Sequence, residues 1–493
     1  MRRSRVHGSS DAPEESAEKL LEVILDEVIQ TASMPFDEWQ KLWTSPFIPM
    51  AIPAGQDREY QCTQTAVDAA HKLTSQTWKQ RADLRQTISR SAFDRLSFTA
   101  IGQTITLSPT HLPPGQQTGT PDRAFYAAMA ADYAASLDVA ATKARPDYDR
   151  HIPCHLFDVS QGVAPFAVGP VRFLPRVEWI RTYVTDPTVF RLVDRIERGT
   201  LSPTGLSKRA LTPGATQEVL AARDIISFLG NFPWIATIRV RGHEPNQSHH
   251  KAAVIVGLAT DLIGLRFHLE DARRFARAGQ RHLLNEARLA TDMNGRFLRG
   301  WTSQRPGIGG RPGAVAAKMR AEQPFFDAAG QALEAYVVGR NSGKAPHLVE
   351  RWANAVYWFG EARREASDFM AVVDYGCAAD GLSGAGGDAR VLTEFANAAL
   401  NPKSSATPTG GISIPDAVTR IYREGRNKLA HGEEPGLFED QSETRRLGDE
   451  LVSLLLNEIT AELAEILTNR PALLTVSEQH AYRALVTRLK NRP

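Results

Sequence analysis

The sequence has few cysteines, and none of them lies in a metal-binding or redox pattern. Three occur in 493 residues, namely Cys62, Cys154 and Cys377, and they are far apart. The absence of a C-x-x-C pair excludes a zinc ribbon and a thioredoxin-like redox site. HExxH and EF-hand patterns are also absent, so we expect neither a metal nor a cofactor. So little cysteine is typical of the reducing cytoplasm, where we expect this chain to act.

Long hydrophobic runs are absent as well. The longest apolar stretch, residues 252–260, ends at Asp261. It is far shorter than the roughly 20 residues that cross a bilayer, so we expect no membrane span. The N-terminal segment MRRSRVHGSS is basic but is not followed by an apolar segment. We therefore expect no secretory signal and no membrane partner.

The composition that remains is that of an ordinary globular protein. Hydrophobic residues make up 42% of the chain and charged residues 23%, with a formal net charge of +2. This excludes a chain that is disordered throughout, and the length allows two to four domains. We expect an α+β protein, in which a mixed α/β N-terminal region is followed by an all-α helical bundle.

Residues 1–299 combine helical and extended patterns, with a break expected near residue 150. We interpret them as a sensing or regulatory region. Helical spacing of apolar residues predicts helices over 14–32, 121–144 and 215–230. Alternation and β-branched residues predict extended segments over 94–107, 164–185 and 234–241. Arg172 and Arg176, close to Trp179, are interpreted as marking a strand-to-helix junction.

The pattern changes after a segment rich in glycine and proline. Residues 300–313 read GWTSQRPGIGGRPG, and we expect a linker over 300–322. Beyond it, apolar periodicity predicts helices over 323–339, 348–379, 415–431 and 442–468, with inserts at 381–388 and 401–411. These helices predict a bundle over 323–470, followed by a tail helix within 471–493.

The predicted helix over 415–431 ends in the segment IYREGRNKLAHGEE, which carries the chemistry we consider functional. Asn427 and His431 are four residues apart and share a helix face, and Arg426 is adjacent to Asn427. An arginine binds phosphate, and a histidine transfers protons near neutral pH. We therefore take Arg426, Asn427 and His431 as candidate catalytic residues.

The spacing of Arg and His alone is weak evidence. The same spacing occurs at Arg150 with His155, where Pro153 interrupts any helix, and at Arg277 with His282. Neither arginine is followed by asparagine. Only Arg426 combines the asparagine, the expected helix and a glycine directly after the histidine. The alternative is an ordinary helix C-terminus, where His and Gly are common.

The segment YREGRNKLAHG resembles the signature of HEPN-domain proteins (higher eukaryotes and prokaryotes nucleotide-binding), and is most similar to the Apea-like HEPN group. The resemblance extends over roughly residues 323–470 and is sharpest at 420–432. It implies a helical bundle, a homodimer through this domain, and a metal-independent ribonuclease in prokaryotic abortive-infection or anti-phage defence. In that group an acidic residue ends the second helix, and Asp380 in AADGL is the nearest match here.

We therefore expect an endoribonuclease that cuts tRNA or other cellular RNA by attack of a ribose 2′-hydroxyl on the adjacent phosphate. His431 would act as general base or acid, Arg426 would stabilise the phosphorane, and Asn427 would orient one of these groups. The products would carry 2′,3′-cyclic phosphate and 5′-hydroxyl ends, and a phage-derived trigger would start the reaction. The alternatives are a non-catalytic dimeric sensor that binds RNA or nucleotides, and a scaffold that recruits a protein.

Basic residues gather in two places that we interpret as RNA-binding surfaces. Arg420, Arg423 and Lys428 belong to the helix that carries the motif. Residues 266–320 hold twelve Lys/Arg against four Asp/Glu, and we expect Arg273, Arg274, Arg277 and Arg281 to lie along one helix. Solvated helix faces are the alternative for both groups. The histidines of RGHEPNQSHHK (241–251) have a loop-like setting without an i,i+4 pair, which argues against a metal site.

Overall fold

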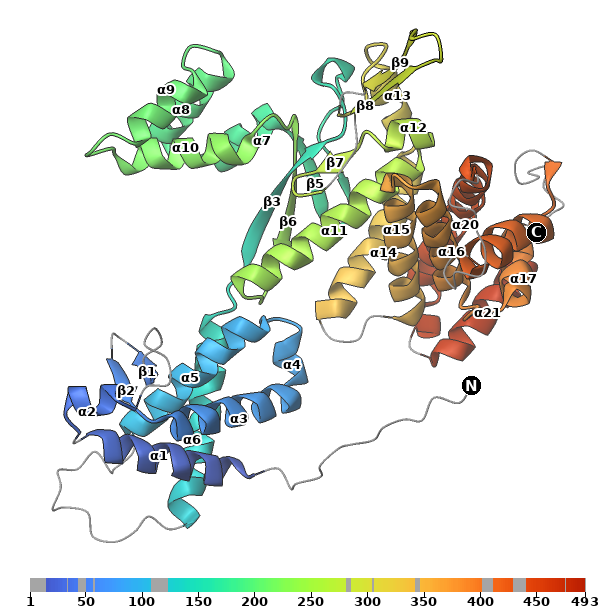
Figure 1. Cartoon of the computed structure of the whole chain (residues 1–493). Coiled ribbons are helices and arrows are strands. Elements are labelled where there is room, and N and C mark those ends of the chain that lie inside the picture. The colour runs from blue at the N-terminus through green and yellow to red at the C-terminus, as the bar shows by residue number, and fades with distance from the viewer. Residues whose placement is uncertain are drawn as a thin grey trace. The chain divides into compact units, whose positions relative to one another are not determined.

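The computed structural model divides the chain into two compact units (Figure 1). Unit 1 comprises residues 1–148 and 240–250, and unit 2 comprises 149–239 and 251–493. The chain therefore leaves unit 1, returns to it once and leaves it again, and the Gly- and Pro-rich segment lies within unit 2. The structure describes residues 15–32, 34–42, 50–55, 58–107, 123–280, 285–303, 306–341, 346–400, 411–428, 440–474 and 476–492.

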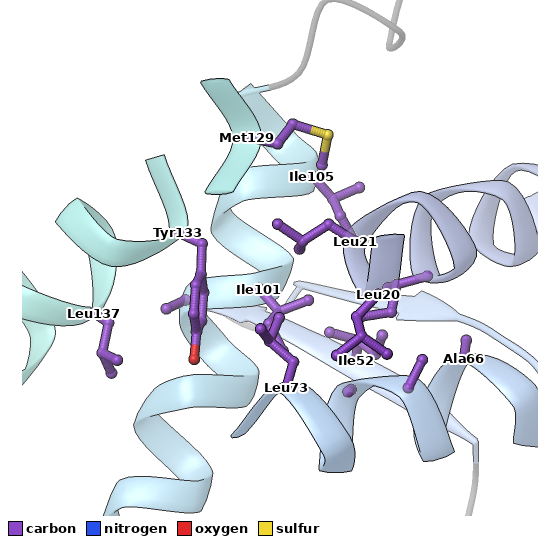
Figure 2. Close-up of a cluster of buried hydrophobic side chains, with 14 of the residues drawn as sticks. Leu20, Leu21, Ile52, Ala66, Leu73, Ile101, Ile105, Met129, Tyr133 and Leu137 are labelled. Carbon is purple, nitrogen blue, oxygen red and sulfur yellow. The ribbon is translucent and has the colours of Figure 1, made fainter. Parts of the chain in front are cut away.

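Unit 1 packs helices around a small antiparallel sheet of β1 (Ala51–Gly55) and β2 (Arg58–Gln61). Its helices are α1 (Ala17–Ala32), α2 (Phe36–Gln40), α3 (Gln64–Gln80), α4 (Ala82–Arg85), α5 (Arg90–Leu107) and α6 (Arg123–Lys143). The predicted helices over 14–32 and 121–144 are confirmed for their described residues. Figure 2 shows Leu20 and Leu21 of α1, Leu73 of α3, and Ile101 of α5 meeting in the core.

The extended segment predicted over 94–107 is wrong, because these residues belong to α5. The Thr99 and Thr104 hydroxyls donate to the carbonyls of Arg95 and Ala100, each at 2.9 Å, which satisfies them within a helix. At Gly102 the helix approaches β1 so closely that an added Cβ would lie 2.9 Å from Ala54 Cα. Packing of the whole helix thus outweighs the strand preference of its threonine, isoleucine and phenylalanine side chains.

Unit 2 contains a five-stranded sheet in the order β4-β5-β6-β3-β7. The strands are β3 (Tyr148–His155), β4 (Phe166–Val168), β5 (Val171–Pro175), β6 (Trp234–Val240) and β7 (Ala276–Arg277). The β4–β5, β5–β6 and β3–β7 pairs are antiparallel. The strand predicted over 234–241 is confirmed. In the segment 164–185 only β4 and β5 are extended, and Pro175 precedes a helix that begins at Arg176, at the expected junction.

Four helices lie between β5 and β6 in the chain, and their apolar side chains form a separate cluster. They are α7 (Arg176–Tyr183), α8 (Pro187–Glu197), α9 (Pro203–Ala210) and α10 (Gln217–Leu229). Trp179, Val193 and Leu229 are among the buried residues of this cluster. Arg176 donates to both carboxylate oxygens of Glu197, which ties α7 to α8. The helix predicted over 215–230 is α10, and the prediction is confirmed.

The basic segment from 266 onward does not form the helix that we expected. Between α11 (Pro245–Leu265) and β8 (Asn285–Thr291), the short α12 (Leu269–Ala272) is the only helix among the described residues, and β8 pairs antiparallel with β9 (Phe297–Ser303). His249 and His250 lie in α11, so the loop expected there is also wrong. Gly279 has φ +80° and Gly295 has φ +75°, and at both positions the chain turns instead of continuing a helix.

The segment expected to be a linker is packed where it is described. Ile308 is 5% exposed, and its backbone N–H donates to the Leu156 carbonyl at 2.7 Å. Its own carbonyl accepts from the Asp158 N–H at 2.8 Å. Residues 300–303 belong to β9. Part of 300–313 is therefore hydrogen-bonded to the residues that follow β3. A flexible linker would not have such fixed contacts.

Within the described residues, all regular structure after residue 313 is helical. The helices are α13 (Ala314–Ala321), α14 (Gln323–Asn341), α15 (His347–Arg364), α16 (Asp368–Ser383), α17 (Ala389–Leu400), α18 (Ile414–Val418), η4 (Thr419–Asn427), α20 (Ser442–Asn469) and α21 (Glu478–Lys490), with a 3₁₀ turn η5 at Pro471–Leu474. The predictions over 323–339 and 442–468 are confirmed. The tail helix α21 is confirmed too, and Leu485 and Leu489 bury one face of it.

Two details of this helical part differ from the predictions. The single helix expected over 348–379 is two helices that pack on each other, α15 and α16, and the Ser367 hydroxyl accepts from the Met370 N–H to begin the second. The insert expected at 381–388 starts late, because α16 continues to Ser383 and ends at Gly384 with φ +66°. Helix α17 was not predicted. The fold is thus mixed α+β with helices predominating, and none of the described helices is long and apolar enough to span a membrane.

Candidate active site

The candidate site lies where α16 crosses η4, the segment that carries Arg426. The two helices come together at a pair of glycines. A Cβ at Gly425 would lie 2.5 Å from Val372 Cγ1. A Cβ at Gly376 would overlap Arg426 Cβ and lie 2.7 Å from Arg426 Cγ. Since real side chains do not approach so closely, both glycines are needed for this crossing.

The segment η4 is a π-helix over nine residues, Thr419–Asn427. The predicted helix over 415–431 begins correctly, because Ser413 caps it and Pro415 lies in its first turn. Over Thr419–Asn427 the prediction of an α-helix is wrong, and residues 429–431 lie outside the described part of the chain. A π-helix has i→i+5 hydrogen bonds, is rare, and often occurs at functional sites. The wider turn changes which side chains within Thr419–Asn427 share a face. The i,i+4 relation of Asn427 and His431 extends beyond the described residues and stays a prediction.

Three side chains meet at the crossing. The Tyr422 hydroxyl donates to Asp380 Oδ1 at 2.7 Å, although the two residues are 42 positions apart. Arg426 Nη2 lies 3.9 Å from Asp380 Oδ2, and its guanidinium carbon is 5.5 Å from the centre of the Tyr422 ring. Tyr422 is completely buried, whereas the Arg426 and Asp380 side chains are 25% and 20% exposed. The arrangement holds a partly exposed arginine head over a buried aromatic ring.

Asp380 is held in place from a second direction. It lies in the last turn of α16, and its Oδ1 also accepts from the Gly387 N–H at 3.2 Å. The turn that follows α16 therefore folds back onto this carboxylate. Tyr482 of α21 closes the same end of the helix, donating its hydroxyl to the Leu382 carbonyl at 3.0 Å.

Burial sets the protonation of the neutral groups around Arg426. Burial, followed by the hydrogen bond to Asp380, raises the pKa of Tyr422, so its hydroxyl remains a donor at neutral pH. Burial also raises the pKa of the Cys377 thiol, and its hydrogen bond with Arg426 offsets only part of this increase. Cys377 is thus a protonated neighbour of the arginine rather than a reactive thiolate.

A buried polar network anchors α16 behind the site. The Tyr375 hydroxyl donates to Asp449 Oδ1 at 2.8 Å, and Arg363 donates to both oxygens of Asp449 at 2.6 and 3.0 Å. Asp449 is 7% and Arg363 5% exposed. Gly448 leaves room for the Tyr375 ring, since an added Cβ would lie 2.9 Å from its Cδ2. This network connects α15, α16 and α20, and so fixes the helix that presents Asp380.

The structure describes some of the predicted site residues fully and others in part or not at all. Arg426 and Asp380 are brought together, and their catalytic roles stay predictions. His431 lies outside the described residues, and Asn427 is described only through its helical backbone. We had no sequence signal for Cys377 or for the glycine pair, because their roles depend on a crossing between distant helices.

The predicted RNA-binding residues fall into two separate groups. Near the motif, Arg420 forms an ion pair with Glu443 at 2.8 Å, Arg423 is exposed and Lys428 is half-buried. In the other group, Arg273 donates to the Arg363 carbonyl at 3.2 Å, and burial lowers its pKa. Arg274 lies in the turn after α12 and Arg277 lies in β7, so they do not share a helix, and both are half-buried. Arg281 lies outside the described residues. Among the residues that the structure describes, no group of three or more His, Cys, Asp and Glu is placed to hold a metal ion.

Comparison of the chain with protein-family models, with curated proteins and with solved structures finds no match.

Proposed function

We propose that this protein is a metal-independent endoribonuclease of the HEPN type that acts in defence against phage. The observation that carries the proposal is the presentation of Arg426, within the R-N-x-x-x-H motif, as a partly exposed cation over the buried Tyr422 and beside Asp380. A guanidinium held in this way is suited to the charge that develops on a phosphate in the transition state.

In the proposed reaction, a ribose 2′-oxygen forms a bond to the adjacent phosphorus while the bond from phosphorus to the 5′-oxygen breaks. One proton leaves the 2′-hydroxyl, and one is delivered to the departing 5′-oxygen. His431 carries out one of these transfers, Arg426 stabilises the phosphorane, and Asn427 orients the histidine or the RNA. The chain ends are a 2′,3′-cyclic phosphate and a 5′-hydroxyl.

A single arginine and histidine make a small active site. We infer that two copies of the chain pair through the helical domain, because two-fold symmetry brings a second set of the same residues to the same place. The substrate in this scheme is tRNA or another cellular RNA in the cytoplasm. A phage-derived signal, received by the N-terminal part of the chain, would start cleavage.

A second candidate function is a non-catalytic dimer that binds RNA or nucleotides. The observation in its favour is the carboxylate of Asp380, 3.9 Å from Arg426 Nη2. Together with the contact of Arg426 with the Tyr422 ring, this contact within the chain can hold the helix crossing together whether or not the arginine takes part in a reaction, as a non-catalytic dimer would also require.

The two functions are separated by a cleavage assay with matched variants. Wild type, His431→Ala and Arg426→Ala would be incubated with total bacterial RNA in EDTA, with and without extract of phage-infected cells. Arg390→Ala is the control, because its side chain is 90% exposed on another helix. We expect wild type and the control alone to produce fragments with cyclic-phosphate ends.

Two results would contradict the proposal. RNA binding by all four proteins without cleavage under either condition would favour the non-catalytic dimer. Fragments that persist undiminished in His431→Ala would mean that the activity arises elsewhere in the chain.

A further inference from the structure

The hairpin β8–β9 stands apart from the five-stranded sheet. Seven residue pairs, from Asn285 with Ser303 to Thr291 with Phe297, form an antiparallel ribbon of two strands with no third strand among the described residues (Figure 1). A two-stranded ribbon has little stability of its own in water. A ribbon that joins no larger sheet among the described residues is therefore a feature that needs a reason.

The turn of this ribbon is well organised. Asp292 Oδ1 accepts from the N–H groups of Asn294 and Arg296, each at 2.9 Å, and Gly295 takes the positive φ of +75° that closes the turn. The Asp292 carboxylate is thus engaged with the backbone. The tip presents Met293, which is completely exposed.

Large apolar side chains are exposed on both faces of the ribbon. Leu289 is 67%, Phe297 62% and Leu298 53% exposed. Because neighbouring residues of a strand point to opposite faces, Phe297 and Leu298 project from different sides. Exposed apolar surface is therefore available on both sides of the ribbon.

The charge of the ribbon favours a polyanion. Between residues 285 and 303 the sequence has three arginines, at 288, 296 and 299, against Glu286 and the engaged Asp292. Residues 266–320 as a whole have twelve Lys/Arg against four Asp/Glu. An exposed aromatic ring between basic residues is the combination on which unpaired bases stack while arginines contact the backbone.

We propose that the β8–β9 ribbon is a binding element for single-stranded RNA, with Phe297 as a stacking platform and Arg296 as a phosphate contact. This inference rests on the proposed ribonuclease function, since it assigns to the ribbon the capture of that enzyme's substrate. The ribbon contributes to RNA affinity and not to the chemical step.

The test measures binding separately from cleavage. Binding of a fluorescent uridine oligomer and of a perfect RNA duplex would be followed by anisotropy, with the full chain carrying His431→Ala to prevent cleavage. Into this background we would introduce Phe297→Ala, Phe297→Tyr and Arg296→Gln. Leu211→Ala is the matched control, because Leu211 is an apolar residue of unit 2 with 78% exposure.

We expect Phe297→Ala to weaken binding of the oligomer about 5- to 150-fold, the range for losing a base stack. Phe297→Tyr should retain binding, since its ring still stacks. Arg296→Gln should make RNA affinity less dependent on salt concentration, by an amount that corresponds to about one released counterion. The control should bind as well as the parent chain, and thermal unfolding of all variants should be unchanged because the substituted side chains are exposed.

Three results would overturn the inference. Equal RNA affinity of Phe297→Ala and the parent would show that the ribbon does not bind RNA. If wild type cleaves RNA, the proposed ribonuclease function would still stand. A change in sedimentation mass with unchanged RNA affinity would identify the ribbon as a contact between copies of the chain or with another protein. Absence of both RNA binding and cleavage in wild type would reject the inference together with the proposed function.

Discussion

At the scale of single residues, the most informative neighbour of Arg426 is Asp380. The resemblance implies an acidic residue at the end of the second helix, and Asp380 is the nearest match. The structure sets this carboxylate between Tyr422 and Arg426. Asp380 is thus placed to orient the arginine, and its charge offsets part of the positive charge of Arg426.

We predict that Asp380→Asn strengthens RNA binding while it slows cleavage. The asparagine oxygen can still accept from the Tyr422 hydroxyl, but the charge that opposes phosphate is lost. For a partly exposed pair the gain in affinity should be about two- to fivefold. Binding is measured with the cleavage-deficient His431→Ala background and cleavage with its parent. Tyr422→Phe is the comparison, because it removes the hydroxyl and keeps the charge.

An unchanged affinity in Asp380→Asn would show that Asp380 does not compete with phosphate for Arg426. An unchanged rate would show that the carboxylate does not position the arginine for the reaction. Because binding and cleavage report different roles of Asp380, one of the two predictions can be contradicted while the other holds.

At the scale of secondary-structure elements, the site depends on how closely two helices cross. The π-helical η4 and α16 meet where Gly425 and Gly376 have no side chains. Apolar periodicity predicted helices in both places but could not indicate their separation, which depends on residues about fifty positions apart. The buried contacts of Asp449 with Tyr375 and Arg363 add a second fixed point on α16.

We predict that Gly376→Ala destabilises unit 2 by about 1–3 kcal/mol, the usual cost of forcing a methyl group into a packed contact. Gly381→Ala in the same helix is the control, because nothing lies within 4 Å of its added Cβ. There the substitution should be neutral or stabilising by up to about 1 kcal/mol, since alanine favours helix. Urea unfolding measures both changes. Equal effects of the two substitutions would contradict the close crossing.

At the scale of the whole molecule, unit 1 is completed by a segment from the middle of the chain. Residues 240–250 return to it, and Glu244 lies at the start of α11. The Glu244 N–H donates to the Thr87 carbonyl at 2.9 Å, and its buried side chain accepts from the N–H groups of Ser89, Asn246 and Gln247 at 3.0 to 3.3 Å. Burial alone would raise the pKa of Glu244, but these hydrogen bonds outweigh it and lower the pKa below 4.5.

We predict that Glu244→Gln destabilises unit 1 by about 1–2 kcal/mol at pH 7, because the amide replaces a charged acceptor of several N–H groups. A carboxyl with a lowered pKa in the folded state stabilises that state above its unfolded pKa. The difference between wild type and variant should therefore shrink as the pH falls below 4.5. Urea unfolding from pH 7 to pH 3 measures it. Glu59→Gln, an exposed change in the same unit, should have little effect, and a difference that persists at pH 3 would contradict the argument.

The sequence by itself determined most helices and the identity of the candidate motif, because these depend on neighbours a few residues apart. Periodic leucines and isoleucines placed α1 and α20, and the succession of Arg426, Asn427 and His431 can be read directly. Only the tertiary structure decided that residues 94–107 are helical, that α15 and α16 are separate, that Thr419–Asn427 forms a π-helix, and that Asp380 lies beside Arg426. The physical reason is the same in each case. These features are set by side chains and glycines that meet across long separations in the chain, where the free energy of packing outweighs local preference.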